Sequence, residues 1–379
     1  MLRDEVFKKT LEHYLAPIRP FLDDPSISEV MINGPDEVFI ERKGRLERTP
    51  ARFSDESSLQ SAVKNIAQFV GRTINEDSPR LDARLPDGSR VHAVFPPCAR
   101  RGTYVSIRKF AKETLTIDKL IGFGALTAEG REFLDLLVNV EKNIIVAGGT
   151  GSGKTSMLNA MSAMIPPTER VLVIEDSTEL QLQREHVVQM ETKTADRRGR
   201  GRVSIRDLFH SALRMRPDRI VIGEIRGEEA LDLIQALSSG HGGSMSTLHA
   251  NSPVDTLYRL ETMALLSGVE IPLFALRAQI ASSVQIVVHV SRFLDGSRKL
   301  VHISEVLPMG EGTGYRLQDL YVFREKGRDP SGKVLGELTW TGITPTFSDA
   351  PAGKGLSDRI DLTRRVWSRP SAPVEAARG

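Results

Sequence analysis

The residues with the clearest capacity for chemistry lie in one short stretch, GGTGSGKT, which runs from Gly148 to Thr155. It matches the pattern G-x-x-x-x-G-K-[ST], whose glycines let backbone N–H groups close around phosphate oxygens. Lys154 would supply positive charge for the outer phosphates, and the hydroxyl of Thr155 can hold Mg²⁺. A glycine-rich turn without a ligand is the alternative, but four glycines, a lysine and a threonine in this register argue against it. The stretch predicts a nucleoside triphosphatase with these nucleotide-binding residues: Gly148, Gly149, Thr150, Gly151, Ser152, Gly153, Lys154, Thr155 and Ser156.

Acidic side chains end two apolar segments that follow this loop. RIVIGE ends in Glu224, and VLVIED ends in Glu175 and Asp176. A carboxylate in such a place can polarise a water near the terminal phosphate, or hold Mg²⁺ directly or through water. For a single acid at a strand end, a solvated side chain without a role is an equally good interpretation. Two such strand ends beside a phosphate-binding loop favour a functional role.

Histidines and arginines give weaker signals. GHGGSMSTLHAN contains His249, which could donate to a terminal phosphate, although spacing alone favours a structural histidine. The basic loop RRGRGR, residues 197–202, is either a solvated surface loop or a contact for phosphate or nucleic acid. Arginines are also numerous in strand-like segments before residue 110, and for any one of them a surface ion pair is the simpler interpretation. A zinc site is not expected, because the sequence contains no compact set of cysteine, acidic and histidine residues that could complete one.

Alternating strand and helix patterns would position these groups. An apolar run, 144–147, precedes the phosphate-binding loop, and a helical pattern follows it. The segments 171–176 and 219–224, with IVVHV near residue 288, predict further buried strands, and helical patterns lie between them. This alternation predicts an α/β fold with a largely parallel sheet, whose carboxyl edge carries the ligand site.

The rest of the chain divides by pattern. Residues 54–70 predict an amphipathic helix, and turn signals at Asn33–Gly34–Pro35 and Asp87–Gly88 separate alternating segments that predict strands. GYRLQDLYVF and GKVLGELTWTGI predict a hairpin near the C-terminus. The expected divisions are a helical segment (1–22), a smaller mixed α/β domain (23–110), a linker with a hinge or plain connecting role (111–126), a P-loop domain (127–310), and a C-terminal hairpin with a partly disordered tail (311–379).

Composition excludes several classes of protein. The chain has 379 residues, a formal net charge of +2 and one cysteine, Cys98, so a disulfide framework is impossible and global charge gives no argument for nucleic acid binding. No apolar run approaches the roughly 20 residues that span a bilayer. The first residues, MLRDEVFKKTLEHYL, lack the apolar centre of a signal peptide. We therefore expect a cytoplasmic protein that meets a membrane only through partners.

Four segments, in this order, resemble the sequence boxes of the ATPases that power type II secretion, type IV pili and type IV secretion. GGTGSGKT resembles their Walker A box and VIEDSTEL their acidic box. LRMRPDRIVIGEIRGEEA resembles their atypical Walker B box, and GHGGSMSTLHANSP resembles their His box. Four ordered boxes are far more specific than a single phosphate-binding loop.

Other segments are similar to the CpaF-type ATPases of Flp/Tad pilus assembly. SEVMINGPDEVFIERKGRLE, DARLPDGSRVHAVFPP and VSIRKF lie before the phosphate-binding loop, and GRGRVSIRDL and LQDLYVF lie after it. Gly227 follows Glu224–Ile225–Arg226, where pilus-retraction and type II members usually carry aspartate. The zinc cysteines of type II members are also missing.

The resemblance implies a RecA-like ATPase domain in a homohexameric ring that uses ATP and Mg²⁺. It implies that Glu224 activates water, that Glu175 assists at the Mg²⁺ side with Thr155, and that His249 senses the terminal phosphate. Lys154 would act on the phosphates. Basic positions of the first domain that could reach the nucleotide match these residues: Arg84, Arg90 and Arg108.

The implied function is a motor that drives pilin assembly or protein export at the inner membrane, without direct nucleic acid binding. Its implied partners are an inner-membrane platform protein and other pilus or secretion components. One alternative is a conjugation-type ATPase that moves DNA or effectors, because it would share all four boxes. The other is a nucleotide-gated scaffold with little turnover.

Overall fold

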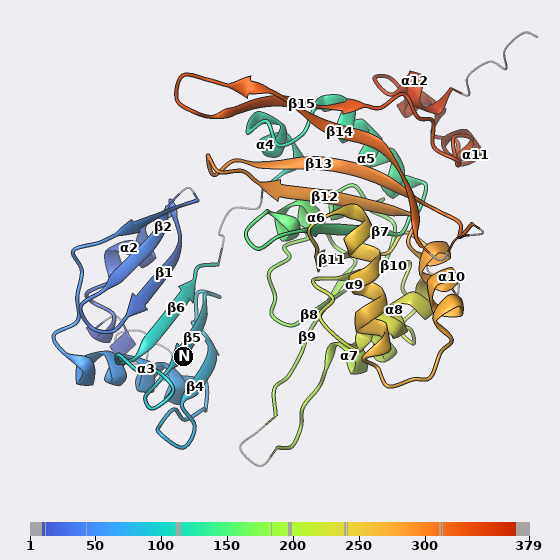
Figure 1. The fold of residues 1–379 in the computed structure, drawn as a ribbon. Helices are drawn as coiled ribbons and strands as arrows, with labels where there is room; N and C mark the ends of the chain where they lie inside the picture. The colour runs from blue at the N-terminus through green and yellow to red at the C-terminus, as the bar shows by residue number, and fades with distance from the viewer. Residues whose placement is uncertain are drawn as a thin grey trace, which may run out of the picture. The chain divides into compact units, whose positions relative to one another are not determined.

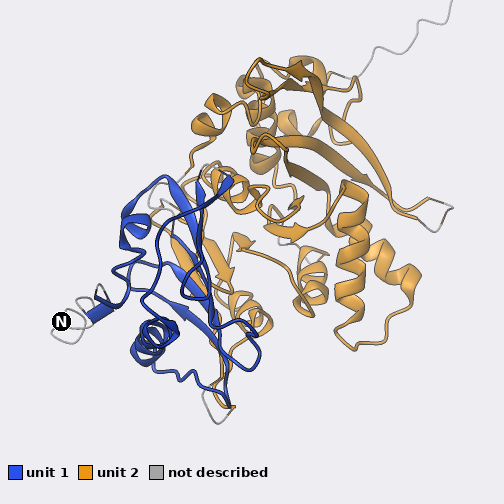
Figure 2. Cartoon of the chain, turned by 60° about the vertical axis from the view of Figure 1, so that its left-hand side comes forward, with its two compact units in different colours: residues 1–113 blue, residues 114–379 orange. Residues whose placement is uncertain are grey.

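The computed structural model of the chain describes residues 10–11, 13–42, 44–110, 115–182, 184–195, 199–238, 240, 242–310, 312 and 314–368. The chain divides into two compact units, residues 1–113 and 114–379 (Figure 2). The first unit has one hydrophobic core of its own, and the second has a core on each face of its sheet.

The first unit is built on a six-stranded antiparallel sheet with the order β3-β2-β1-β6-β5-β4 (Figure 1). The buried residues of β1 are Ile27, Val30 and Ile32, and a register shift near Ser28 explains the uneven spacing of the first two. The strands are β1 (Ile27–Asn33), β2 (Val38–Arg42), β3 (Arg45–Arg48), β4 (Arg80–Arg84), β5 (Arg90–Val94) and β6 (Tyr104–Arg108).

Helices α2 (Arg19–Asp23) and α3 (Glu56–Phe69) complete this unit. The carboxylate of Asp55 accepts a hydrogen bond from the backbone N–H of Ser58 and so caps α3. Its apolar side chains recur at helical spacing and enter the core, as the sequence pattern predicts. Residues 1–9 and 12 of the predicted N-terminal helical segment lie outside the described residues, and Leu11 and Leu15, which are described, pack in the core.

The second unit is built on a nine-stranded sheet with the order β15-β14-β13-β12-β7-β11-β10-β8-β9 (Figure 1). Neighbouring strands run parallel from β12 to β9, and β13, β14 and β15 add an antiparallel edge. The strands are β7 (Ile144–Gly148), β8 (Val171–Glu175), β9 (Val187–Glu191), β10 (Arg219–Ile222), β11 (Met245–His249), β12 (Ile286–Arg292), β13 (Arg298–Leu307), β14 (Arg316–Arg328) and β15 (Val334–Trp340).

Helices cover both faces of this sheet, which explains why its central strands are apolar throughout. In β7, Ile144 and Val146 pack with α5 and α6 on one face, whereas Ile145 and Ala147 pack with α7 to α10 on the other. The helices are α4 (Ile117–Gly122), α5 (Ala128–Asn139), α6 (Lys154–Ser162), α7 (Ile205–Ala212), α8 (Glu229–Ser238), α9 (Pro253–Leu265), α10 (Leu273–Ser283), α11 (Ala350–Gly353) and α12 (Arg364–Trp367). No helix of the described residues is long and apolar enough to cross a bilayer.

The predicted C-terminal hairpin is present as the antiparallel pair of β14 and β15. It also continues the sheet of the P-loop domain, because β14 pairs with β13, so the sheet extends past the predicted domain boundary at residue 310 to Trp340. Part of the segment predicted as a linker, 111–126, instead packs with the second unit. α4 contacts α6, and the carbonyl oxygen of Gly124 accepts a hydrogen bond from Lys299. Residues 111–114 lie outside the described residues.

Three acids on α5 hold the C-terminal segment, a contact we name the α5 clasp. The carboxylate of Glu132 accepts hydrogen bonds from the backbone N–H groups of residues 361, 362 and 363. One turn away on each side, Asp135 pairs with Arg359 and Glu129 pairs with Arg365. Burial acts to raise the pKa of Glu132, but the hydrogen bond from the Thr363 hydroxyl and the three backbone hydrogen bonds together lower it. The tail predicted to be disordered, 369–379, lies outside the described residues.

Candidate functional site

The phosphate-binding loop joins β7 to α6, the strand–loop–helix arrangement that the sequence predicts. A side chain at Gly148 would collide with the carbonyl oxygen of Val290 in β12, so only glycine allows this close approach. Gly151 and Gly153 have φ values of +68° and +95°, which favour glycine. Gly153 precedes α6 without any side-chain cap, so the amide groups at this helix start remain directed at the loop. Backbone geometry therefore builds a cradle suited to an anion.

Lys154 lies at the start of α6 and is 7% exposed. Its Nζ donates to the carbonyl oxygen of Gly149, 3.0 Å away, inside the loop. The same Nζ lies 3.2 Å from Nδ1 of His249. A buried ammonium group is thus held at the mouth of the cradle, where the outer phosphates of a nucleotide would bind.

His249 connects this lysine to Glu224. It ends β11, which lies between β7 and β10 in the sheet, so the carboxyl ends of the three strands meet. Nε2 of His249 lies 2.8 Å from Oε1 of Glu224. Burial and the nearby charge of Lys154 lower the pKa of His249, against the opposing effect of Glu224. The imidazole is therefore neutral at pH 7. Its Nδ1 can accept a hydrogen bond from Lys154 while its Nε2 faces the carboxylate of Glu224.

Glu224 is also paired with an arginine that the sequence analysis did not assign a role. Arg226 donates from Nε to Oε2 of Glu224 over 2.7 Å, and its Nη2 contacts the same oxygen. Its Nη1 reaches Oδ2 of Asp176 at 3.2 Å. These contacts link Glu224, two residues beyond β10, to Asp176, one residue beyond β8. The strand-end acids are thus connected at one edge of the sheet.

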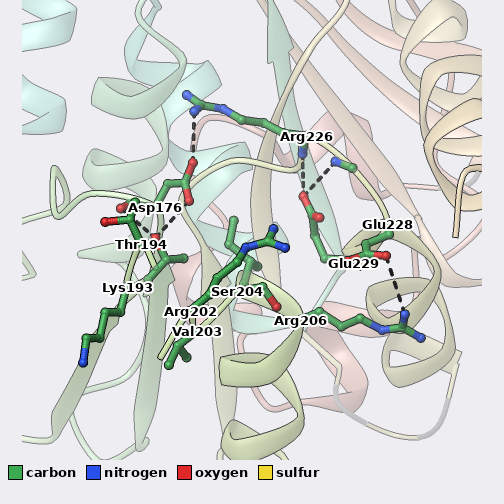
Figure 3. A pocket seen from close by; sticks show the side chains of 13 residues that line it. Asp176, Lys193, Thr194, Arg202, Val203, Ser204, Arg206, Arg226, Glu228 and Glu229 are labelled. Carbon is green, nitrogen blue, oxygen red and sulfur yellow. Dashed lines mark hydrogen bonds and ion pairs between the residues drawn. The ribbon is translucent and has the colours of Figure 1, made fainter. Parts of the chain in front are cut away.

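A polar cavity of about 360 Å³ opens beside this ion pair (Figure 3). Arg226 and Asp176 meet across its rim, and the carboxylate of Glu229 accepts from the backbone N–H groups of Arg226 and Gly227. Its lining comes from the strand ends of β8 and β9 and from the start of α7. Arg202, from the predicted basic loop 197–202, also lines it, whereas residues 197 and 198 of that loop lie outside the described residues.

Glu175 is almost completely buried, with 3% of its surface exposed. Its Oε1 accepts from the backbone N–H groups of Glu179 and Leu180, at 2.9 and 3.0 Å. Burial raises the pKa of this carboxyl to about 7, and these two hydrogen bonds oppose the rise. A side chain at Gly223 would press on Cγ of Glu175, so the glycine before Glu224 makes room for it. Glu175 therefore lies at the end of β8, next to the residue that follows β10. Its role at Mg²⁺ stays a prediction.

The three arginines of the first unit lie in one row across its sheet. Arg84 is paired in register with Arg90 across β4 and β5, and Arg90 is paired with Arg108 across β5 and β6. Residues directly opposite one another on antiparallel strands share a face, so the three side chains project from the same side. The next residue in the row is Glu29 of β1. The structure thus gathers the predicted arginines into one basic row within their unit.

The residues of the site are suited to a magnesium nucleotide. The cradle has no room for a Cβ at Gly148, and Lys154 and the uncapped start of α6 would favour an anion bound there. Thr155, the predicted hydroxyl ligand of Mg²⁺, and Ser156, predicted only to bind the nucleotide, lie in the first turn of α6 and are partly exposed. No group of three or more His, Cys, Asp or Glu side chains among the described residues could hold a metal ion by itself. A cation at this site would therefore depend on nucleotide oxygens and water as well as protein oxygens.

Known proteins resemble this chain over most of its length. The type II/IV secretion system protein family matches residues 12–317. VirB11, a type IV secretion system protein of Brucella suis, is 38% identical over 325 residues, which cover 78% of this chain and 90% of VirB11. A Mycobacterium tuberculosis protein named as a conjugal transfer protein is 35% identical over 328 residues, covering 85% of this chain and 92% of that protein. The pilus retraction motor PilT, solved with bound ADP, has a TM-score of 0.52 at 20% identity, covering 87% of this chain and 83% of PilT. The likeness to PilT confirms the predicted fold class.

Proposed function

Because this chain belongs to the type II/IV secretion system protein family and is an ATPase, we propose that it is the motor of a secretion or pilus-assembly system. The observation that carries the proposal is the contact of Lys154, His249 and Glu224 at the carboxyl edge of the sheet. His249 ends β11, Glu224 follows the adjacent parallel strand β10, and Lys154 begins α6, the helix after the phosphate-binding loop. The arrangement provides a cation for phosphate, a neutral imidazole and a carboxylate in one place.

The phosphate-binding loop holds the triphosphate of ATP in this proposal. Backbone N–H groups of residues 149–155 and the start of α6 contact phosphate oxygens, and Lys154 neutralises charge on the outer phosphates. Thr155, with Glu175 acting directly or through water, would hold Mg²⁺, and the bound ion would neutralise charge that develops on the phosphate oxygens. A carboxyl with a pKa near 7 is partly protonated at neutral pH, so Glu175 has to ionise to serve this purpose.

Glu224 is the group that orients and polarises the attacking water. It is 17% exposed, which leaves it reachable by a water molecule, while Arg226 holds its Oε2 and His249 lies 2.8 Å from its Oε1. Proton transfer in the transition state by such a positioned group contributes about 10²–10⁴-fold to a rate. His249 stands between Glu224 and Lys154, so it is placed to respond when a terminal phosphate binds the lysine.

The basic row of the first unit completes the site in this proposal. Arg84, Arg90 and Arg108 would neutralise transition-state charge once the first unit closes on a nucleotide, within one subunit or from its neighbour in a homohexamer. Arginines in this role remain charged at any working pH and fork toward phosphate oxygens.

The transported substrate defines two candidates. We favour pilin assembly of the Flp/Tad kind, with an inner-membrane platform protein as the partner at the cytoplasmic face, on the segments that resemble CpaF-type ATPases. The second candidate is a conjugation-type ATPase that moves DNA or effectors. It is favoured by the Mycobacterium tuberculosis relative, which is named for conjugal transfer and aligns with 85% of this chain.

The test is ATPase activity per subunit as a function of protein concentration, with Mg²⁺, for the wild type and Lys154→Ala. We expect specific activity to rise with concentration as subunits assemble, and Lys154→Ala to lose nucleotide binding and turnover, because the outer phosphates lose their cation. A sizing measurement over the same concentrations relates any rise to assembly. Unchanged nucleotide affinity and turnover in Lys154→Ala would remove the phosphate-binding loop from the proposal.

A further inference from the structure

The hairpin between β12 and β13 carries two arginines against the phosphate-binding loop. Arg292 is the last residue of β12, Arg298 is the first residue of β13, and the two are paired in register. Their side chains therefore share one face of the sheet edge. Nε of Arg298 donates to the carbonyl oxygen of Gly151 over 2.8 Å. Nη1 of Arg292 lies 3.3 Å from the point where a Cβ of Gly151 would stand.

This hairpin is held from several sides, so the arginines extend from a fixed base. The backbone N–H of Phe293 donates to the carbonyl oxygen of Ser297 across the turn. Asp295 accepts from the N–H of Ser297 within the turn and from the N–H of Val334 at the start of β15. On the other face, Lys299 is buried and donates to the carbonyl oxygen of Gly124. The hairpin is thus tied to β15 and to the segment after α4.

The bond to Gly151 fixes the orientation of one peptide group in the cradle. A trans peptide is planar, and its C=O and the following N–H point in opposite directions. When Arg298 holds the Gly151 oxygen on the outer side, the N–H of Ser152 is directed to the inner side. That N–H faces the carbonyl of Gly149, which also receives Lys154. Gly151 has a φ of +68° and glycine's freedom, so its peptide would otherwise adopt several orientations.

Arg292 contributes in a different way. Its Nη1 lies 3.3 Å from the point where a Cβ of Gly151 would stand, so the guanidinium places positive charge beside the outer turn of the cradle. Arg292 and Arg298 are both exposed on this side, where an anion could reach them. Charge at this distance favours binding of any phosphate in the loop, without requiring a particular orientation of the side chain.

We propose that the β12–β13 hairpin completes the nucleotide site: Arg298 is a positioning residue that orients the Gly151–Ser152 peptide, and Arg292 is a binding residue that supplies charge for the phosphates. The inference rests on the proposed function, because it assigns these roles to the same ATP site. The substrate class is a nucleoside di- or triphosphate. The two roles predict opposite responses to lysine, which keeps the charge of arginine but lacks its Nε–H and planar fork.

The experiment measures binding of a fluorescent ATP analogue and steady-state ATPase kinetics in the full chain. The variants are Arg298→Lys, Arg298→Gln, Arg292→Lys and Arg292→Gln, with Arg324→Gln on β14 as the matched exposed control. We expect both Arg298 variants to weaken nucleotide binding at least about threefold, because a charge-assisted hydrogen bond is lost even with lysine. Arg292→Gln should weaken it by a similar factor of about three, and Arg292→Lys should restore it.

The outcomes separate this inference from the proposed function. Wild-type affinity in Arg298→Lys would overturn the positioning role, and equal losses in Arg292→Lys and Arg292→Gln would overturn the charge role. Lys154→Ala is measured alongside. If it abolishes binding while all four arginine variants bind normally, the hairpin inference is wrong and the ATP site stands. If Lys154→Ala binds normally, the site itself is wrong. Circular dichroism and melting temperature identify any variant that fails to fold, and Arg298→Lys, the mildest change, then decides.

Discussion

Replacing Glu224 by glutamine should separate ATP binding from ATP hydrolysis. The substitution keeps the size and one carbonyl oxygen of the side chain but removes its negative charge and its ability to take a proton. Arg226 would keep Asp176 as a partner, so the change strands no buried cation. His249 would lose the charge that raises its pKa and would stay neutral. The site should therefore retain its architecture.

The magnitude follows from these contacts. Loss of a positioned base costs about 10²–10⁴-fold in turnover, which corresponds to about 2.7–5.5 kcal/mol in the activation free energy. Glu224 is 17% exposed and Arg226 is 49% exposed, so their ion pair is screened by solvent and its loss should change the free energy of unfolding by less than about 1 kcal/mol. ATP affinity should stay within about threefold of the wild type or improve, because a negative charge near the phosphates is removed.

The assay combines single-turnover hydrolysis, equilibrium binding of an ATP analogue, and thermal unfolding of the same preparation. Single-turnover conditions isolate the chemical step from product release. Asp176→Asn is the control, because it removes the other carboxylate bound to Arg226 and leaves Glu224 in place. Hydrolysis by Glu224→Gln within tenfold of the wild-type rate would refute the base role. A large loss of ATP affinity would refute the claim that this carboxylate acts mainly on water.

Two further predictions concern the buried carboxyl and the basic row. The pKa of Glu175, about 7 in the folded protein against an ordinary 4.5, means that stability from its protonation is complete below about pH 4.5 and is lost as pH rises through about 7. Glu175→Gln should therefore gain melting temperature relative to the wild type as pH rises from 4.5 to 8, and a constant difference would contradict the raised pKa. Arg90→Gln, at the centre of the row, should lower turnover at least about tenfold while ATP affinity is nearly unchanged, as measured by kcat and by analogue binding. An equal loss with Glu41→Gln, an acid on β2 of the same sheet, would instead indicate a general effect on the unit.

Local patterns were sufficient to predict the phosphate-binding loop and several strands around it. The glycines that the loop requires are consecutive in sequence, and the buried strands at residues 144, 171 and 219 are apolar on both faces. The amphipathic helix now seen as α3 was predictable for the same reason, since its apolar residues repeat at helical spacing. These features depend on neighbours along the chain, which a sequence displays directly.

Features that depend on sheet order were not predictable in this way. β11 has the sequence MSTLH, and its Ser246 and Thr247 are buried although they are polar. The segment therefore lacks the apolar run by which a central strand is recognised. Because that strand was missed, spacing alone favoured a structural role for His249, whereas the strand order places it between Lys154 and Glu224. β9 was missed as well, because its residues are only partly buried at the edge of the sheet.

Pairs of residues that meet only across a turn or between strands were also beyond local patterns. Arg292 and Arg298 are six positions apart, and their shared face becomes evident only from the register of β12 and β13. The pairing of Arg226 with both Glu224 and Asp176 requires β10 and β8 to be adjacent. The row of Arg84, Arg90 and Arg108 was suggested by resemblance, and the strand register supplies the reason that the three share a face.

The α5 clasp has a mechanical consequence. The C-terminal segment that it holds is the last described part of the chain, and α5 contacts α6, the helix that follows the phosphate-binding loop. Tension applied to the end of the chain would have to break several ion pairs and backbone hydrogen bonds on α5 at once. Only then could β13, β14 or β15 separate from the sheet. Bonds loaded in parallel share a pulling force, whereas a free terminus opens one bond at a time. A domain that does work against a load benefits from having its end fastened in this manner.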